Sequence, residues 1–470
     1  MKILYINLPT NMEKRRDFEQ LMPPYGLAII SSYLKDNDVE IEVLDAKAHQ
    51  MVRKEILNYI EKKKPDIIGF TCMTPEFSLI SSLLPSIKEM IPKIKVVLGG
   101  PHPTLAPLSI LKQNLNIDIV VIGEGEYTSL EMVKALENGK SLKNIKGLGF
   151  RNNNKITINK PRELIQNLDS LPYADWDSLP VNKYFAHVSS RKNYVKFLVT
   201  RGCPYSCTFC AAPLIMGKKL RKRSPKNIVG ELIHLYDEHK VREVGFSDST
   251  LNIDNKWLRE LCIELIEMNK ERPIIWECNV RADTTDEKTI KIMKEAGCVL
   301  VTMGIESGNQ KMLYSMKKGE TLDQFRRAVS IFNKQKMPVL SSFILGMPGE
   351  TTETINDTLN FAKELNLFNA GFNLAMPFPR TEFCEQAIKE GWVLNDSIMA
   401  NMSPSIVSYV PKEMTKEQLR MAYKNVNKKY HLRLSHLLKI AASMKSFTNL
   451  KIHLWGGLRI IKKTGGRLKT

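Results

Sequence analysis

The fold of this chain is decided by the stretch Arg201-Gly202-Cys203-Pro204-Tyr205-Ser206-Cys207-Thr208-Phe209-Cys210. Its three cysteines have the spacing C-x3-C-x2-C and follow a strand-like run, Tyr194–Thr200. This spacing would also suit one face of a helix. However, Gly202 and Pro204 disfavour a helix that starts before the second cysteine. We therefore expect a loop that gathers three thiols around a common centre.

Three thiolates in one loop suit an iron–sulfur cluster. A four-iron cluster normally takes four protein ligands, so three cysteines leave one iron open to bind a small molecule. Zinc held by three cysteines and a water is the alternative, because zinc also tolerates an open position. A structural disulfide fits poorly, since three thiols leave one over.

The cysteine loop, with Phe209 before its last cysteine, resembles the signature of the radical S-adenosylmethionine enzymes. Residues 1–395 resemble their cobalamin-binding subgroup, including the segments Pro23-Pro24-Tyr25-Gly26-Leu27, Gly99-Gly100-Pro101-His102-Pro103-Thr104 and Gly123-Glu124-Gly125-Glu126. This resemblance implies a [4Fe-4S] cluster on Cys203, Cys207 and Cys210, which are also the proposed catalytic residues. It further implies S-adenosylmethionine on the open iron, cleavage to a 5′-deoxyadenosyl radical, and cobalamin in the leading domain.

Length and composition are those of an ordinary globular protein. The 470 residues suffice for two or three domains, with 43% hydrophobic and 25% charged residues. No apolar run reaches the roughly 18–20 residues of a membrane span, and the first residues do not resemble a signal peptide. We expect a cytoplasmic protein, with a peripheral position at the inner membrane face as a further option. The five cysteines outside the loop are expected to be small buried hydrophobes.

Residues 1–140 alternate short apolar runs with helical segments, which predicts an α/β doubly wound (Rossmann-like) sheet. The strand candidates are Ile3–Leu8, Glu40–Leu44, Asp66–Thr71, Lys95–Leu98 and Asp118–Ile122. Such sheets bind ligands beyond the carboxyl ends of their strands. Any nucleotide-binding sheet would show glycine and polar residues there, but the resemblance assigns them to cobalamin. The candidate cobalamin-binding residues are Thr74, Gly99, Gly100, His102, Gly123, Glu124 and Gly125.

One departure from many cobalamin proteins concerns the lower cobalt ligand. The chain lacks an Asp-x-His-x-x-Gly loop, and His49 has the wrong spacing from Asp45. His102 lies between two prolines and is expected to touch the edge of the corrin. We therefore predict cobalt without a protein imidazole.

Residues 141–193 are expected to form a linker with a hairpin around Asn152-Asn153-Asn154. The β/α alternation then resumes over residues 194–395, the predicted radical S-adenosylmethionine core, with six units that suit a partial (β/α)6 barrel. The six strand candidates are Lys196–Thr200, Glu243–Ser247, Ile274–Asn279, Val299–Gly304, Val339–Gly346 and Ala370–Met376.

Polar and glycine residues follow these strands, in an order that resembles the family's S-adenosylmethionine site. The candidates are Phe209, Asp248, Glu277, Asn279, Arg281, Glu306, Gly346 and Gly349. Arg281 can clamp a carboxylate, Glu306 can accept ribose hydroxyls, and the glycines offer an edge for adenine. Arg380 stands where the family pattern Pro-aromatic-Pro-Gly-Thr has a glycine, which is a departure on the substrate side.

Residues 396–470 form a basic and mainly helical region. After Glu417 there are thirteen lysines and arginines and no acidic residue, and leucines are interleaved with the cations. Such a stretch suits an anionic membrane surface. Nucleic acid is the alternative, not favoured, and a solvated helical face is a third reading.

The leading functional hypothesis is cobalamin-dependent methylation of an unactivated carbon in a small-molecule or lipid-like substrate. A reducing protein of the flavodoxin or ferredoxin type would supply the electron. Cyclisation or rearrangement without methyl transfer is the first alternative. A methylthiotransferase would need a second cysteine-rich site, and only Cys72 is available in the leading domain. The remaining alternative is a non-catalytic RNA- or membrane-binding protein in which zinc has a structural role.

Overall fold

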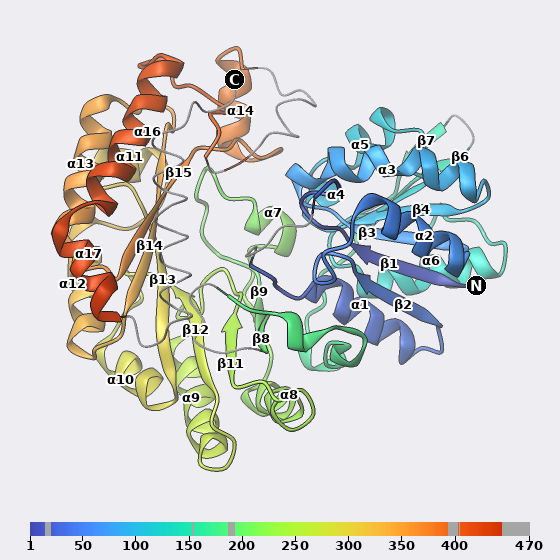
Figure 1. Ribbon diagram of the computed structural model, residues 1–470, viewed down its shortest axis with the longest axis horizontal. Helices are drawn as coiled ribbons and strands as arrows, with labels where there is room; N and C mark the ends of the chain where they lie inside the picture. Colours follow the sequence, from blue (N-terminus) through green and yellow to red (C-terminus); the bar gives the residue numbers. More distant parts are fainter. Residues whose placement is uncertain (15–19, 153–154, 187–192, 393–402, 404, 444–470) are drawn as a thin grey trace. The chain divides into compact units, whose positions relative to one another are not determined.

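The computed structural model describes residues 1–14, 20–152, 155–186, 193–392, 403 and 405–443 (Figure 1). The chain forms two compact units. The first contains Met1–Pro204 and Ala211–Asp248, and the second contains Tyr205–Cys210 together with the described residues from Ser249 onward. The cysteine loop therefore has Cys203 in the first unit and its other two cysteines in the second.

The first unit is built on a seven-stranded sheet of order β2-β1-β3-β4-β5-β6-β7. The five leading strands are parallel, as predicted for a doubly wound sheet: β1 (Ile3–Asn7), β2 (Ile41–Asp45), β3 (Ile67–Thr71), β4 (Lys95–Gly99) and β5 (Ile119–Val121). The predicted hairpin, β6 (Leu148–Asn152) and β7 (Lys155–Ile158), extends this sheet in antiparallel fashion.

Helices cover both faces of this sheet (Figure 1). Helix α1 (Tyr25–Lys35) packs beside α6 (Glu126–Glu137). Helix α2 (Arg53–Lys63) packs beside α3 (Phe77–Met90). After β4 the chain forms two short helices, α4 (Pro101–Leu105) and α5 (Pro107–Gln113), instead of one continuous helix. The break falls at Ala106, because a residue that precedes proline is disfavoured in the helical conformation.

The first unit also contains the beginning of the predicted radical core. Strand β8 (Tyr194–Phe197) pairs in parallel with β11 (Glu243–Phe246), and α8 (Pro225–Asp237) lies between them in sequence. The short strands β9 (Thr200–Arg201) and β10 (Arg221–Lys222) pair in antiparallel fashion on either side of α7 (Ala212–Met216).

The second unit continues the β/α alternation. Its parallel strands are β12 (Ile275–Val280), β13 (Cys298–Glu306), β14 (Val339–Leu345) and β15 (Asn369–Leu374), each paired with the next. The accompanying helices are α9 (Asn255–Asn269), α10 (Glu287–Glu295), α11 (Gln310–Ser315), α12 (Leu322–Lys334), α13 (Thr352–Glu364) and α14 (Glu382–Lys389). With β8 and β11, six parallel strands alternate with helices along the chain, as the partial-barrel prediction requires.

The basic region contains two described helices, α16 (Lys416–His431) and α17 (Leu434–Ser443). Helix α16 packs on α13 and β15 through Leu419, Tyr423, Val426 and Tyr430. Its apolar face is thus part of the second unit's core. No helix in the described part of the chain has the length and apolar character needed to cross a membrane.

Candidate functional site

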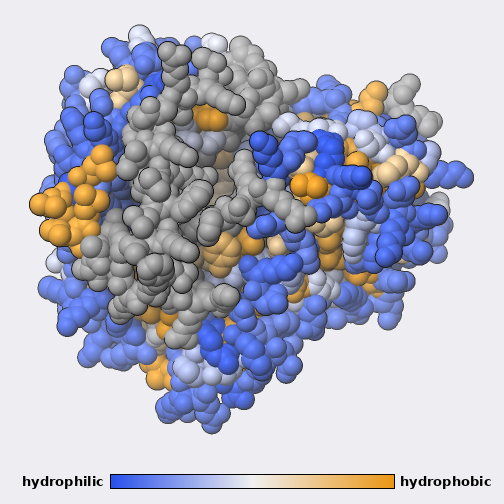
Figure 2. Space-filling view, viewed as in Figure 1, coloured by the Kyte–Doolittle hydropathy of each residue, from blue (hydrophilic) through white to orange (hydrophobic). Residues whose placement is uncertain are grey.

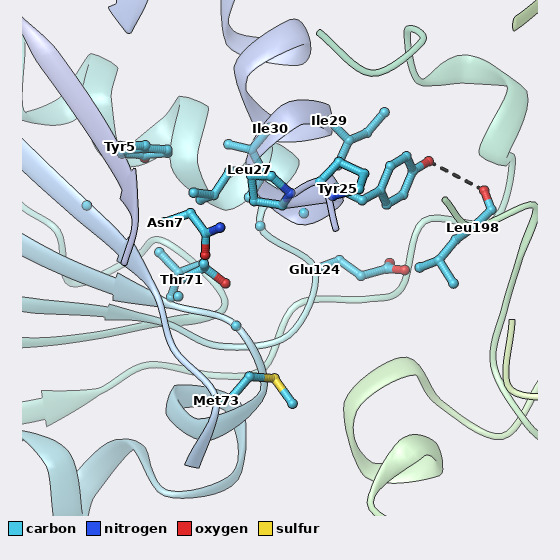
Figure 3. Close-up of a pocket in the computed structure, with 18 of the residues that line it drawn as sticks. Tyr5, Asn7, Tyr25, Leu27, Ile29, Ile30, Thr71, Met73, Glu124 and Leu198 are labelled. Atoms are coloured by element: carbon cyan, nitrogen blue, oxygen red, sulfur yellow. Dashed lines mark hydrogen bonds between the residues drawn. The ribbon is translucent and has the colours of Figure 1, made fainter. Parts of the chain in front are cut away.

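A cavity of about 720 Å³ opens at the carboxyl ends of β1, β3, β4 and β5 in the first unit (Figure 3). Its volume falls in the usual range for small-molecule sites. The lining includes residues that follow each of these strands, the start of α1, and part of the segment between β8 and Arg201. This is the ligand-binding edge of a doubly wound sheet.

Glycines leave the backbone of this cavity uncovered. A Cβ atom at Gly26 or Gly123 would meet no atom within 4 Å, and at Gly99 only the Val121 side chain at 3.9 Å. Any larger residue would fill space that a ligand can otherwise use. Gly100 and Gly123 also have positive φ angles of 101° and 81°, which glycine adopts without strain. The cavity therefore suits a flat ligand that lies close to the backbone.

The walls of the cavity are mostly apolar. Tyr25, Leu27, Ile29 and Ile30 come from α1, and Met73 lies on the opposite side (Figure 3). A few polar groups interrupt these walls, which is the usual composition of a cofactor pocket. The described residues that line the cavity include no histidine.

Five of the seven candidate cobalamin residues line this cavity. They are Gly99, Gly100, Gly123, Glu124 and Gly125. The other two are not among the lining residues. Thr74 begins a short 3-10 helix and is buried. His102 lies in α4.

His102 is an isolated buried imidazole. It is 1% exposed, packs against the ring of Phe77 with centroids 5.2 Å apart, and neither ring nitrogen has a hydrogen-bond partner among the described residues. Burial lowers the pKa of His102 to about 4, so the ring is neutral near pH 7. It occupies a packing position in α4 and does not extend into the cavity.

The first cysteine of the loop is held by local backbone contacts. Cys203 is buried, and its N–H donates to the carbonyl of Gly217 at 3.0 Å. Gly202 before it has φ +99°, and a Cβ there would collide with the carbonyl oxygen of Lys219. Only glycine fits this position, which explains the Gly-Cys sequence at the strand exit.

Asp248 lies two residues after the end of β11 and supports the segment that leads to Cys203. Its carboxylate accepts the N–H of Val199 at 3.2 Å and also the N–H of Thr200. Burial raises the pKa of Asp248 to about 6, and these hydrogen bonds oppose the rise. Asp248 thus holds backbone in this structure, whereas its predicted contact with a cofactor stays a prediction.

The other two cysteines lie in the second unit and are half-buried. The N–H of Cys210 donates to the carbonyl of Cys207 at 3.1 Å, which closes a tight turn. Thr208 anchors this turn, because its N–H donates to Met316 and its carbonyl accepts from Phe383, both at 2.9 Å. Phe209 packs against the core cluster that contains Met316 and Phe383.

Arg281 does clamp a carboxylate, but the carboxylate belongs to the chain itself. Its Nε and Nη2 lie 3.0 Å from the two oxygens of Asp283, and Nη2 also donates to the carbonyl of Lys318 at 3.0 Å. The guanidinium lies over the ring of Tyr205 at 3.5 Å from the centroid. Arg281 therefore braces the cysteine loop from the second unit.

Glu306 belongs to a buried charged cluster that includes two residues missed by sequence reasoning. Lys318 Nζ lies 3.6 Å from Glu306 Oε1 and 3.2 Å from Glu320 Oε2. Burial tends to lower the pKa of Lys318, but these two carboxylates raise it above its ordinary value, and Cys207 adds to the effect. Lys318 and Glu320 follow α11 rather than a strand, so a search of strand ends does not find them.

The remaining candidates lie at the ends of β12 and β14 or near β15. Glu277 is buried in β12, and Asn279 is half-buried on the same face. A Cβ at Gly346 would lie 2.9 Å from Leu419 of α16, whereas one at Gly349 would meet open space. Of the two glycines, Gly349 is the one that leaves room for a ligand. Arg380 has φ +66°, the conformation that explains the usual glycine there.

A separate group of possible metal ligands lies in the first unit. Asp177, His234 and His239 have ligand atoms within 4.8 Å of one another. The Nε2 of His239 lies 3.1 Å from Asp177 Oδ1, and the Asp177 side chain is 78% exposed. A surface contact between Asp177 and His239 accounts for this arrangement, because burial lowers the pKa of His239 and disfavours its charged form.

Two family models match the chain. The B12 binding domain matches residues 15–133, and the Radical SAM superfamily matches residues 197–362. The cavity residues that follow β3, β4 and β5 lie within the first range, and all three loop cysteines lie within the second.

Relatives match over most of their length. An uncharacterized methyltransferase of Pyrococcus horikoshii is 34% identical, over 93% of this chain and 94% of the relative. The anaerobic magnesium-protoporphyrin IX monomethyl ester cyclase of Rubrivivax gelatinosus is 28% identical, over 82% and 70%. Among solved structures, the radical S-adenosylmethionine methyltransferase TsrM from Kitasatospora setae, with cobalamin and a [4Fe-4S] cluster bound, has a similar fold. Its TM-score is 0.69 at 20% identity, covering 89% of this chain and 80% of that one.

Proposed function

Because the chain belongs to the cobalamin-binding radical S-adenosylmethionine family, we propose that it methylates an unactivated carbon of a small-molecule or lipid-like substrate. The protein is a radical S-adenosylmethionine enzyme, and its cofactors are a [4Fe-4S] cluster, S-adenosylmethionine and cobalamin. When bound, these cofactors supply a 5′-deoxyadenosyl radical and a transferable methyl group.

The cavity in the first unit is the observation that carries the proposal. Uncovered backbone at Gly99 and Gly123 suits a macrocycle, and apolar walls exclude water from its face. Arg201 lines the same cavity and lies two residues before Cys203. A corrin there would therefore adjoin the chain segment that carries the first cluster ligand.

In this proposal Cys203, Cys207 and Cys210 hold the cluster. The five cavity residues described above hold the corrin, and the candidates of the second unit orient S-adenosylmethionine. Within that set, Glu306 is fixed by Lys318 and Gly349 leaves open space. The functional division that we propose is 1–140 for cobalamin, 141–193 for the linker, 194–395 for the radical core and 396–470 for the basic region.

The mass of the product tests the proposal. Methylation predicts that the product carries one additional methylene, with its methyl group labelled when S-adenosylmethionine is labelled at that carbon. A product of unchanged carbon count, or one that has lost hydrogen only, would instead support cyclisation or rearrangement. The similarity to a cyclase keeps that second candidate open.

Three exposed leucines of α17 favour a peripheral membrane contact. Leu434 is 71% exposed, Leu437 46% and Leu438 61%. Hydrophobic side chains gather at the left edge of Figure 2, where Figure 1 places α17. In the sequence Arg433 precedes these leucines and Lys439 follows them, so we propose that the enzyme works in the cytoplasm at an anionic membrane surface. Residues 444–470, which carry the rest of the predicted basic stretch, lie outside the described part of the chain.

Flotation with anionic vesicles tests this contact. The full chain should float with vesicles that contain phosphatidylglycerol, and replacement of the three exposed leucines by serine should abolish flotation. Equal recovery with neutral vesicles would contradict the electrostatic part of the proposal. A flavodoxin- or ferredoxin-type reductant remains the electron donor that we propose, and a nucleic-acid partner is not proposed.

A further inference from the structure

The rim of the cavity contains a buried network of ion pairs. Arg201 Nη1 lies 3.1 Å from Glu124 Oε1, and its Nη2 lies 2.6 Å from Glu126 Oε1. The three side chains are 9%, 8% and 3% exposed, and all three residues line the cavity. Arg201 thus spans two carboxylates, one in the loop after β5 and one at the first residue of α6.

Glu124 is shared with a second arginine. Arg221 Nη1 lies 2.7 Å from the same Oε1, and Glu124 Oε2 accepts the N–H of Ile165 at 2.7 Å. Arg221 lies opposite Arg201 in the β9–β10 pair. Two guanidinium groups and two carboxylates therefore balance in charge, and Glu124 links Arg201, Arg221 and the backbone of Ile165.

A second contact ties the same segment to the opposite wall. The hydroxyl of Tyr25, in the first turn of α1, donates to the carbonyl of Leu198 at 3.4 Å (Figure 3). Both residues line the cavity. The segment from Leu198 to Arg201 is thus held on two sides by residues that a ligand in the cavity would touch.

The electrostatics of the network depend on what fills the cavity. Ion pairs weaken in water and strengthen as the local dielectric falls. These side chains are already almost fully buried, and a ligand that covers the rim would exclude the little water that still reaches Arg201 and Glu124. The position of Arg201, and of Cys203 two residues later, then becomes more tightly fixed.

We propose that Arg201, Glu124 and Glu126 are positioning residues that couple corrinoid binding to retention of the iron–sulfur cluster. Corrinoid in the cavity stabilises the network, and the network holds Cys203 where it ligates iron. The coupling is reciprocal, so the loaded cluster also tightens corrinoid binding. This inference rests on the proposed function of the same site.

The experiment measures iron release to a ferrous chelator from the anaerobically reconstituted protein, with and without hydroxocobalamin. In the wild-type protein, corrinoid should slow release by about fivefold, the size expected when a coupling at the low end of the usual range acts fully on the barrier to iron loss. Arg201→Lys keeps the charge but loses the two-pronged contact, and Glu126→Gln keeps the shape but loses the charge. Each variant should still bind corrinoid and iron. The ratio of the iron-release rate without hydroxocobalamin to the rate with it should fall toward one.

A matched control is available in the same unit. Arg162 pairs with Glu131 at 2.5 Å and is not among the cavity-lining residues, so Arg162→Lys should keep the wild-type ratio. A wild-type ratio of one, or variants that keep the wild-type ratio, would overturn the coupling. Circular dichroism and corrinoid binding by equilibrium filtration distinguish a lost coupling from a lost fold. Failure of the wild-type chain to bind either cofactor would instead count against the proposed function.

Discussion

The guanidinium of Arg281 stacks on the ring of Tyr205, 3.5 Å from its centroid. Tyr205 lies two residues before Cys207, and Arg281 is itself fixed by Asp283. Arg281 therefore holds the Tyr205 side chain in the part of the cysteine loop that belongs to the second unit. The contact joins an aromatic residue of the loop to the strand end at which sequence reasoning expected a cofactor clamp.

Tyr205→Leu should accelerate iron release from the reconstituted cluster. A cation–π contact contributes about 1 kcal/mol, which corresponds to roughly a fivefold change in rate if the loop must open for iron to leave. The measurement is iron transfer to a chelator under anoxia. The matched control is Tyr236→Leu, which removes a similar stack on Arg242 in the first unit and should leave the rate unchanged. Equal rates for the wild type and Tyr205→Leu would show that the brace has no role.

Lys318→Met should destabilise the second unit strongly. The change leaves Glu306 buried without its cation and Glu320 with Arg281 alone, a loss of about 3–5 kcal/mol in the free energy of unfolding. The neighbouring Lys317 pairs with Glu382 at the surface and is 55% exposed, so Lys317→Met should cost under about 1 kcal/mol. Urea unfolding monitored by circular dichroism measures both. Similar losses for the two variants would contradict the buried-cluster interpretation.

Glu350 should make the stability of the protein pH-dependent between about pH 5 and 7. Burial raises the pKa of Glu350 from its ordinary 4.5 to about 7, against the hydrogen bonds from Thr354 and Gly346. A carboxyl whose folded-state pKa is raised binds its proton more tightly when folded. Its stabilising contribution is therefore full below about pH 4.5 and is lost as the pH rises to about 7, by roughly 3 kcal/mol.

Glu350→Gln should remove that loss, because the neutral amide has no charged form to desolvate. Urea unfolding at pH 5, 6 and 7 gives the comparison. Glu353→Gln changes an exposed carboxyl in the first turn of α13 and should keep the wild-type slope. A Glu350→Gln variant whose stability falls with pH as steeply as the wild type would refute the assignment.

Bound cob(II)alamin should show no nitrogen superhyperfine splitting from the protein in electron paramagnetic resonance. The described residues that line the cavity include no histidine, and His102 is buried against Phe77. His102→Phe should therefore leave the spectrum unchanged. Splitting that is present in the wild type and absent in this variant would identify His102 as a cobalt ligand and contradict the prediction.

Much of the fold follows from local sequence patterns. The parallel strands were predictable because each is a short apolar run with polar or glycine residues directly after it. The cavity was predictable for the same reason, since such residues meet at one sheet edge. The break at Ala106 could also have been read from Pro107, because proline restricts the residue before it.

The unpredicted features depend on side-chain contacts, some local and some between distant segments, that no sequence pattern marks. The role of Arg201 follows from Glu124 and Glu126, which lie 77 and 75 residues earlier. Lys318 could not be recognised because its partners come from β13 and from the turn after α11, and no periodicity marks it. Arg281 carried the right chemistry for a carboxylate clamp, but sequence alone gave no sign that Asp283 would be the carboxylate.

The most direct test of the central claim is elemental and product analysis of the protein reconstituted under strict anoxia with iron, sulfide and hydroxocobalamin. We predict about four irons and one cobalt per chain, with reductive cleavage of S-adenosylmethionine to 5′-deoxyadenosine. Cys203→Ala, Cys207→Ala and Cys210→Ala should each lose iron and cleavage, whereas Cys262→Ala, a buried cysteine in α9, should keep both. Colourless protein with stoichiometric zinc, no cobalt and no deoxyadenosine would contradict the account.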